Sequence, residues 1–314
     1  MFERVILIMI KKVLTLFVLI CLVTGCTLKD NSSTKNLIVT TSFPCYDFVR
    51  AIVKDTDIEV KMLLKPGMDM HDYEPTPKDI IDIENSLLFV YVGGESDDWV
   101  NGVLDSTKKK KTTTFKLIDS VSLLEEEIKP GMQTSDNEKE LDEHVWTSPK
   151  KAIIIIENLK EKLIEINPKE KEKFESNTNK YIKEIEDIDK RIEVIVKESP
   201  RKELIFADRF PIRYFTDEYG LNYYAAFPGC AHEVEANAKT ISFLIAKVRQ
   251  DKVPAVFSIE LSNKSIANII RKETGVKILT FETAHNITKD DFESKVTYVD
   301  LMERNIGALK EALK

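Results

Sequence analysis

The sequence is poor in the residues that mark non-globular chains. It has only 10 glycines and 11 prolines in 314 residues, which excludes collagen-like and low-complexity proteins. No long basic stripe is present, and Lys108–Lys111 is a lone run, so we expect no nucleic-acid partner. Acidic residues outnumber basic ones by 53 to 46, and 43% of the residues are hydrophobic. The chain can therefore bury a large core, and its length suggests two domains.

The N-terminus carries a short apolar run that follows a pair of lysines. Residues 13–23 are too few to span a bilayer of about 30 Å, but they fit the apolar region of a signal peptide. The run ends in Leu22-Val23-Thr24-Gly25-Cys26, which resembles a bacterial lipobox. We expect a signal peptide over 1–25, lipidation of Cys26 and a tether over 26–36, which would anchor the protein at the outer face of the cytoplasmic membrane. An uncleaved membrane anchor is the alternative.

Strand-like and helix-like patterns alternate twice along the rest of the chain. Apolar strands separated by segments of helix length indicate parallel sheets with helices on both faces. We therefore expect an α/β fold with an N-terminal lobe over 37–148 and a C-terminal lobe over 200–314. The expected strands are Leu37–Thr41, Ile58–Leu64, Leu87–Val92, Thr113–Ile118, Glu203–Ala207, Asn222–Ala226, Ala255–Ile259 and Lys277–Phe281.

Residues 149–199 join the two lobes and contain no glycine between Pro149 and Glu198. Apolar side chains recur there every three or four residues, as in an amphipathic helix, on both sides of a break at Asn167-Pro168. We expect one long rigid helix that packs along both lobes. A coiled coil is the alternative, although sustained heptads are missing.

The chain has four histidines, and two of them lie in constrained loops of the N-terminal lobe. His71 is in a proline-rich loop after the second strand, and His144 follows Asp142 and Glu143 directly before the linker. In open α/β sheets ligands bind beyond the carboxyl ends of the strands, and an imidazole beside a carboxylate suits a divalent metal. Each histidine alone would be structural or exposed, but together they favour a metal site. Asp142 and Glu143 are expected to be local hydrogen-bond partners.

Two motifs here are specific: Gly67-x-x-x-His71-x-Tyr73-Glu74-Pro75-Thr76-Pro77 and His144-Val145-Trp146. With them, the chain resembles the zinc/manganese solute-binding lipoproteins of bacterial ABC importers, in a clostridial-type branch. The resemblance implies two (βα)₄-like lobes bridged by one long helix, with the metal in the interlobe cleft and His71 and His144 as ligands in surface loops. It also implies a monomer that delivers its metal to an ABC permease and its ATPase.

The C-terminal lobe departs from this family pattern. Where typical members place a His or Glu ligand, this sequence has Arg209, which has no lone pair to donate. Asp208 is the nearest substitute, and Glu282 matches the usual acidic ligand. We expect His285 to complete the site, because Zn²⁺ requires four ligands and two imidazoles leave it under-coordinated. His232 is the competing imidazole, and an exposed His285 is the alternative.

Cys45 and Cys230 remain in the mature chain, in loops that follow strands of opposite lobes. A compartment outside the membrane permits disulfides, so one hypothesis is a bond between them across the cleft. Two separate buried thiols are the other hypothesis.

Histidine and carboxylate ligands suit Zn²⁺, and the Irving–Williams order favours Zn²⁺ over Mn²⁺, although Mn²⁺ stays open. The favoured function is therefore metal capture for transport, with the ion as cargo and no cofactor. A metal-dependent hydrolase with Glu74 as its base, or a surface adhesin with a structural metal, are the alternatives. The hydrolase is disfavoured because a Gly-Pro-rich loop replaces the helix that such a site needs.

Overall fold

The structure is a computed structural model that describes residues 36–70, 73–106, 112–134, 140–231 and 235–314. By their contacts, the residues from Asn36 to Lys314 belong to one unit. Cys26 and the signal-peptide and tether predictions lie outside the described residues. In the part of the chain that is described, no helix combines the length and the apolar character that crossing a membrane requires.

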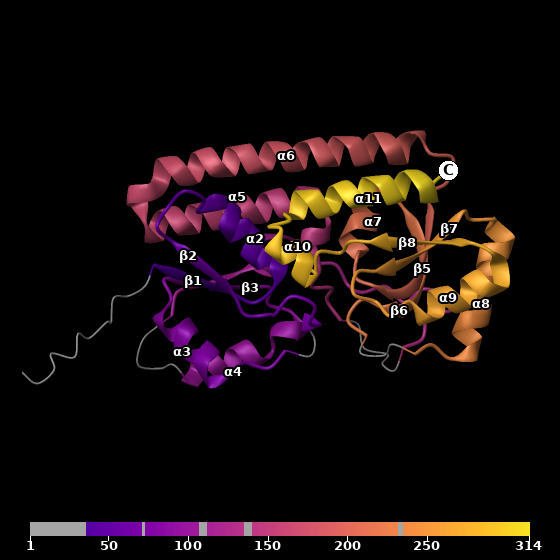
Figure 1. Cartoon of the computed structure of the whole chain (residues 1–314), viewed down its shortest axis with the longest axis horizontal. Helices are drawn as coiled ribbons and strands as arrows, with labels where there is room; N and C mark the ends of the chain where they lie inside the picture. The colour runs from indigo at the N-terminus through magenta and orange to yellow at the C-terminus, as the bar shows by residue number, and fades with distance from the viewer. Residues whose placement is uncertain (1–35, 71–72, 107–111, 135–139, 232–234) are drawn as a thin grey trace, which may run out of the picture. The chain divides into compact units, whose positions relative to one another are not determined.

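The described residues contain one four-stranded parallel sheet in each half of the chain (Figure 1). The strand orders are β2-β1-β3-β4 and β6-β5-β7-β8, so each half has the same order relative to its own first strand. All eight predicted strands are confirmed: the four of the N-terminal half are shorter than predicted, β5 and β6 are longer, and β7 and β8 have the predicted bounds. The strands are β1 Leu37–Thr40, β2 Glu59–Met62, β3 Leu88–Tyr91, β4 Thr114–Lys116, β5 Glu203–Phe210, β6 Asn222–Pro228, β7 Ala255–Ile259 and β8 Lys277–Phe281.

Helices connect the strands in both halves, as parallel pairing requires. Several begin at a side-chain cap, for example the capping box in which Thr76 and Asp79 bond each other's backbone at the start of α3. The connecting helices are α2 Phe43–Ile52, α3 Pro77–Asn85, α4 Trp99–Ser106, α7 Arg213–Tyr219, α8 Ala238–Asp251 and α9 Ser265–Thr274; the short helix α10 (Lys289–Glu293) follows the last strand.

The linker is two helices, α5 (Pro149–Ile166) and α6 (Lys171–Glu198), which pack against each other. The break lies at the predicted place, because Asn167 precedes a proline and leaves the helical conformation, with φ of −134°. The expected long helix is α6. It packs on α2 of the N-terminal half and on the last helix, α11 (Tyr298–Ala312) (Figure 1).

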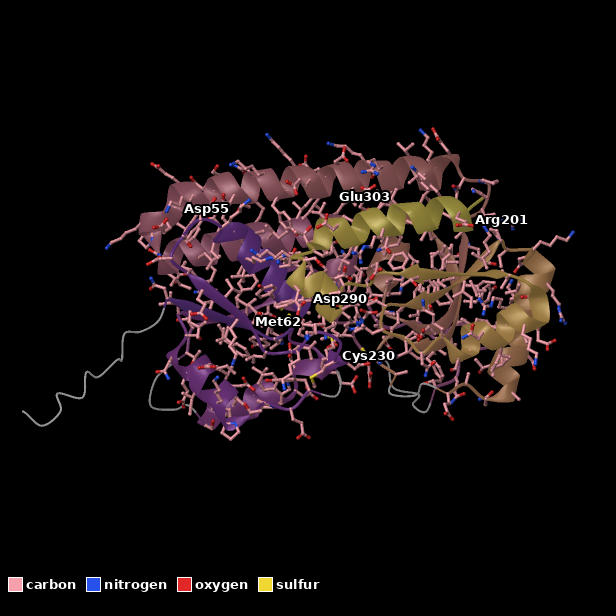
Figure 2. All side chains as sticks on the ribbon, in the orientation of Figure 1. Asp55, Met62, Arg201, Cys230, Asp290 and Glu303 are labelled. Carbon is pink, nitrogen blue, oxygen red and sulfur yellow. The ribbon has the colours of Figure 1, made fainter. Side chains whose placement is uncertain are left out.

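The two halves share one apolar core, whose buried members come from both sheets and from α2, α5, α6 and α11. At the surface, α6 and α11 are joined by a bidentate ion pair between Arg191 and Glu303, with N–O distances of 2.6 and 2.5 Å. Figure 2 labels Glu303, which lies on α11. The helices α6 and α11 therefore hold the two sheets in a fixed relation.

One buried carboxylate ties α2, α6 and α11 together. Asp47 is 1% exposed and accepts hydrogen bonds from the Tyr181 hydroxyl and, at 2.9 Å, from the backbone N of Tyr298. Arg50 forms an ion pair with the same carboxylate. Because each partner is buried or partly buried, the site is stable only when all of these bonds are made.

We predict that Asp47→Ala lowers the free energy of unfolding by about 3–5 kcal/mol, because Arg50 and Tyr181 lose their partner inside the protein. Urea denaturation of the metal-free protein measures this loss. The control is Asp187→Ala on the exposed face of α6, where the carboxylate is 67% exposed. We expect that change to stay within about 0.5 kcal/mol. Equal losses for the two variants would contradict the role of Asp47.

Candidate metal centre

His144 lies directly before the short 3₁₀ turn Val145–Thr147, which leads into α5, and is fully buried, so its predicted place in a surface loop is wrong. Its backbone N donates to Asp142 Oδ1 at 2.7 Å, and its ring nitrogen Nδ1 lies 3.0 Å from the same oxygen. A carboxylate only accepts, so Nδ1 carries a proton and donates it. This pairing fixes the ring and turns the other nitrogen, Nε2, away from Asp142, as in histidines that bind metals.

His285 comes from the loop after β8, in the other half of the chain, and meets His144 directly. The two Nε2 atoms are 2.8 Å apart, and the ring planes are perpendicular. One nitrogen must donate a proton to the other at this distance. Trp146 packs against both rings, with centroid distances of 5.5 and 5.6 Å, so the pair lies against an apolar wall.

A partly buried carboxylate shapes the loop that carries His285. Glu260 follows β7 and accepts hydrogen bonds from Thr283 N at 2.7 Å, Thr283 Oγ1 at 2.6 Å and His285 N at 3.1 Å. Burial raises the pKa of Glu260 to about 7, although its hydrogen bonds to Thr283 lower it. Trp146 Nε1 also donates to Thr283 O at 2.9 Å, which ties the loop to the N-terminal half. Glu260 thus acts on the site through the backbone of His285.

Glu143 is the third member of the cluster and is also buried. It accepts from Ser96 N at 3.1 Å and from the Ser96 hydroxyl, 47 residues away in the sequence, so its hydrogen-bond partner is not the local one that the sequence suggested. A Cβ added to Gly94 would overlap the Glu143 side chain, so glycine is needed there for close approach. The sequence clue to the location of Glu143 was only its adjacency to His144.

The structure brings Glu143, His144 and His285 together, with one potential ligand atom from each within 4.8 Å of the others. Two nitrogens bound tetrahedrally to Zn²⁺ would lie about 3.3 Å apart, given Zn–N bonds of about 2.05 Å. The observed 2.8 Å between the Nε2 atoms is close to that value. A cation could therefore replace the shared proton after a small separation of the rings.

The surroundings of this cluster are electrically negative. Burial alone would lower the pKa of His144, but the charge and the hydrogen bond of Asp142 raise it above the ordinary value, with smaller effects of Glu143 and Glu126. Burial raises the pKa of Glu143, although His144 and Ser96 lower it. A cation brought beside His144 is attracted by the same carboxylates.

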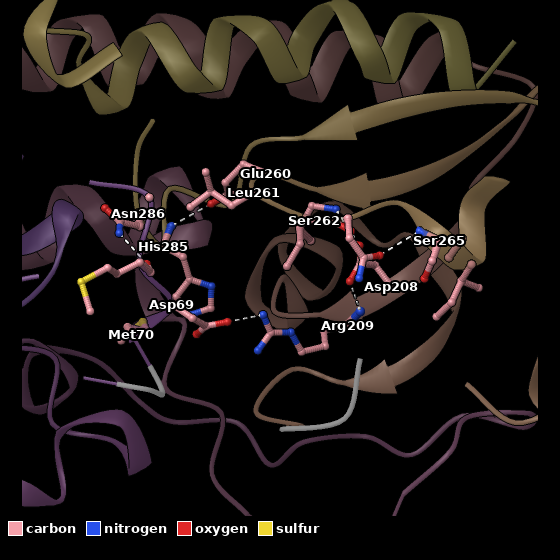
Figure 3. A pocket seen from close by; sticks show the side chains of 16 residues that line it. Asp69, Met70, Asp208, Arg209, Glu260, Leu261, Ser262, Ser265, His285 and Asn286 are labelled. Carbon is pink, nitrogen blue, oxygen red and sulfur yellow. Dashed lines mark hydrogen bonds and ion pairs between the residues drawn. The ribbon is translucent and has the colours of Figure 1, made fainter. Parts of the chain in front are cut away.

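A cavity of about 220 Å³ lies beside His285, between the two halves of the chain (Figure 3). Its walls include Asp69 and Met70 from the N-terminal half, and Asp208 and Arg209 from the end of β5. The volume would hold several water molecules, at about 30 Å³ each. The cavity gives His285 an open side.

Two predicted ligands of the C-terminal half lie outside the cluster. Asp208 accepts from the backbone N of Arg209 at 2.9 Å, and burial raises the pKa of its carboxyl. Glu282 pairs with Arg304 at 3.7 Å. Each carboxylate is held by neighbours of its own half, so the structure does not bring them to His144 and His285. His71 and His232 lie outside the described residues.

The cross-cleft disulfide, one of the two hypotheses for these cysteines, is not formed: in the described residues Cys45 and Cys230 are separate buried thiols. Cys45 lies on α2 beside Ser42 and Thr41, and burial raises its pKa to about 12. The backbone N of Cys230 donates to Glu126 at 2.9 Å. The two cysteines thus have different neighbours, and the alternative of two free thiols holds.

Comparison of the chain with known protein families and structures agrees with a metal-binding role for this geometry. A family model described as "zinc-uptake complex component A, periplasmic" matches residues 38–312. The chain belongs to this family, ZnuA. The family is described as a component of a zinc-uptake complex, not as an enzyme. The prediction that the protein is not an enzyme is therefore confirmed, and the hydrolase alternative is set aside.

Two relatives illustrate the similarity. The chain is 30% identical to the zinc-binding lipoprotein AdcA of Streptococcus pneumoniae over 307 residues, which covers 96% of this chain and 61% of AdcA. The chain thus spans less than two thirds of that relative's length. It is 29% identical to the high-affinity zinc uptake system protein ZnuA of Bacillus subtilis, covering 90% of this chain and 89% of that protein.

Solved structures show the same fold. The Zn(II)-bound ZnuA-like domain of Streptococcus pneumoniae AdcA has a TM-score of 0.74 at 30% identity, covering 88% of this chain and 98% of that domain. The metal-dependent lipoprotein YcdH of Bacillus subtilis has a TM-score of 0.76 at 28% identity, with coverage of 88% and 99%. These likenesses confirm the predicted α/β fold with two parallel sheets.

We predict that Gly94→Ala lowers the free energy of unfolding by about 1–3 kcal/mol, because the new methyl group displaces the Glu143 side chain from Ser96. Denaturant unfolding of metal-free protein measures the change. Gly102→Ala in α4 is the matched control, since nothing lies within 4 Å of its added Cβ. That variant should gain about 0.5–1 kcal/mol from helix propensity. A gain in both variants would rule out a tight contact at Gly94.

Proposed function

We propose that this ZnuA-family chain captures Zn²⁺ outside the cytoplasmic membrane and passes it to an ABC permease and its ATPase. The observation that carries the proposal is the approach of His144 Nε2 to His285 Nε2 at 2.8 Å, from two halves of the chain. The negative surroundings of His144 support a cation as the ligand. The zinc-related names of AdcA and ZnuA support the choice of metal.

The proposed ligands are the Nε2 atoms of His144 and His285, with Glu143 as a nearby carboxylate that shares its oxygens with Ser96. His71 is proposed as a third imidazole. Its position is undescribed, but Met70, its neighbour in sequence, lines the same cavity as His285. A set rich in nitrogen favours Zn²⁺ over Mn²⁺, whose preferred ligands are oxygens.

Membrane attachment is proposed from the lipobox alone. Lipidation of Cys26 would tether the protein near its permease, with the polar residues 30–35 between the anchor and the first strand. We also propose that the protein acts as a monomer, with the lobes bounded at 37–148 and 200–314.

We predict that His144→Ala and His285→Ala each weaken Zn²⁺ binding by more than about 100-fold, which is the upper range for residues that only support a ligand. Competition with a chromophoric chelator measures the affinity. Glu282→Gln is the control because its carboxylate pairs with Arg304. We expect it to bind within a few-fold of the parent. Parental affinity in both histidine variants would exclude this pair as the metal centre.

Zn²⁺ should stabilise the folded protein through its binding free energy. At a free concentration of about 100 times Kd, the expected gain is about 2.7 kcal/mol, seen as a rise in Tm. The rise should disappear in His285→Ala. Competition with Mn²⁺, with the bound metal measured by mass spectrometry, tests the choice of metal. Retention of Mn²⁺ against equimolar Zn²⁺ would overturn the assignment of zinc.

A further inference from the structure

Residues 65–70, which we call the 65–70 segment, belong to the N-terminal half but are bonded to the C-terminal half. Gly67 N donates to the Ile287 carbonyl at 2.9 Å. The side-chain amide of Asn286, which is 2% exposed, donates to the Met68 carbonyl at 2.5 Å. Both partners in the C-terminal half follow His285 directly in the chain. The loop that carries His285 and the 65–70 segment therefore form one bonded unit.

A third bond across the halves is an ion pair. Arg209 Nη2, at the end of β5, lies 2.5 Å from Asp69 Oδ2, and both residues line the cavity beside His285 (Figure 3). The Arg209 side chain is 13% exposed, and its Nη1 also contacts the Ala231 carbonyl at 3.4 Å. The guanidinium is thus held from both sides and has little freedom to turn away from Asp69.

A guanidinium is a poor neighbour for a cation site. It stays protonated at every accessible pH and cannot bind a metal. Its charge repels a nearby cation, and pairing with Asp69 offsets that repulsion only in part. The presence of Arg209 beside the cavity is therefore best explained by its ion pair with Asp69 in the 65–70 segment. This segment leads directly to His71 in the sequence.

We propose that Arg209 is a positioning residue that fixes the 65–70 segment to the C-terminal half before metal binds. With Asn286, it orders this wall of the cavity in advance, so that the metal does not have to order it on binding. The effect on affinity rests on the proposed zinc function. The effect on the metal-free protein does not depend on that function.

Two variants separate positioning from a pure charge effect. If Arg209 positions the segment, Arg209→Gln and Asp69→Asn should both weaken Zn²⁺ binding, by about 10–100-fold, as outer partners of a metal site do. The double variant should then be no worse than either single variant, because both remove the same bond. If only charge matters, Arg209→Gln should strengthen binding, Asp69→Asn should weaken it, and the double variant should resemble the parent.

Hydrogen exchange of the metal-free protein supplies the second measurement. The amide of Gly67 should exchange faster in Arg209→Gln and in Asp69→Asn than in the parent. Arg249→Gln is the matched control, because it removes the same charge from an exposed pair with Glu273 within the C-terminal half. Its exchange at Gly67 should equal that of the parent.

The proposal requires both results. Unchanged Gly67 exchange in the two variants would overturn it, and so would a gain or no change in affinity for Arg209→Gln. If the parent itself bound no Zn²⁺, the proposed function would fail, and the positioning role in metal binding would fail with it. Faster exchange at Gly67 in the two variants would then show only that the Arg209–Asp69 pair bonds the two halves. Failure of the proposed zinc function and failure of the positioning role are thereby distinguished.

Discussion

Two imidazole nitrogens, from loops 141 residues apart in the chain, lie 2.8 Å from each other, and the architecture around them serves to hold that contact. Neither ring could be placed by its own loop alone. Asp142 fixes the Nδ1 side of His144, and Glu260 fixes the backbone of His285. Trp146 lies against both rings and donates to the carbonyl of Thr283, two residues before His285. The contact therefore depends on a rigid junction between the two halves of the chain.

Neighbouring carboxylates take different roles because their environments differ. Asp142 orients His144 through its ring nitrogen Nδ1. Glu143 accepts hydrogen bonds from Ser96 and also lies beside His144 and His285 in the cluster. Asp97 is buried nearby and accepts from two backbone N–H groups, and burial raises its pKa to about 7. Acidic residues near a metal-binding motif are therefore not equivalent candidates for ligands. Asp142 and Asp97, which accept from backbone N–H groups and lie outside the cluster, support the geometry instead.

Polar bonds join the two halves at two places, among the helices α2, α6 and α11 and beside the candidate metal centre. At the helices, Asp47 joins α2 to α6 and α11, inside a core that both halves share. At the site, Asn286 and Arg209 bond the 65–70 segment. Both places use buried or partly buried polar bonds, whose directions restrict the geometry more than apolar contacts do. A preorganised metal site is the expected consequence.

The sequence alone determined the α/β class and all eight strands, and it offered His144 and His285 as candidates that the structure brings together. These rest on local patterns: apolar runs, turn residues, and histidines placed after strands. Tertiary structure decided which groups meet. It buried His144, paired Glu282 with Arg304 and left Cys45 and Cys230 as separate thiols. Such pairings depend on side-chain directions and distances between segments far apart in the chain, which no local pattern encodes. For the same reason Arg209, which the sequence offered only as a missing ligand, proved to be one half of a bond between the two lobes.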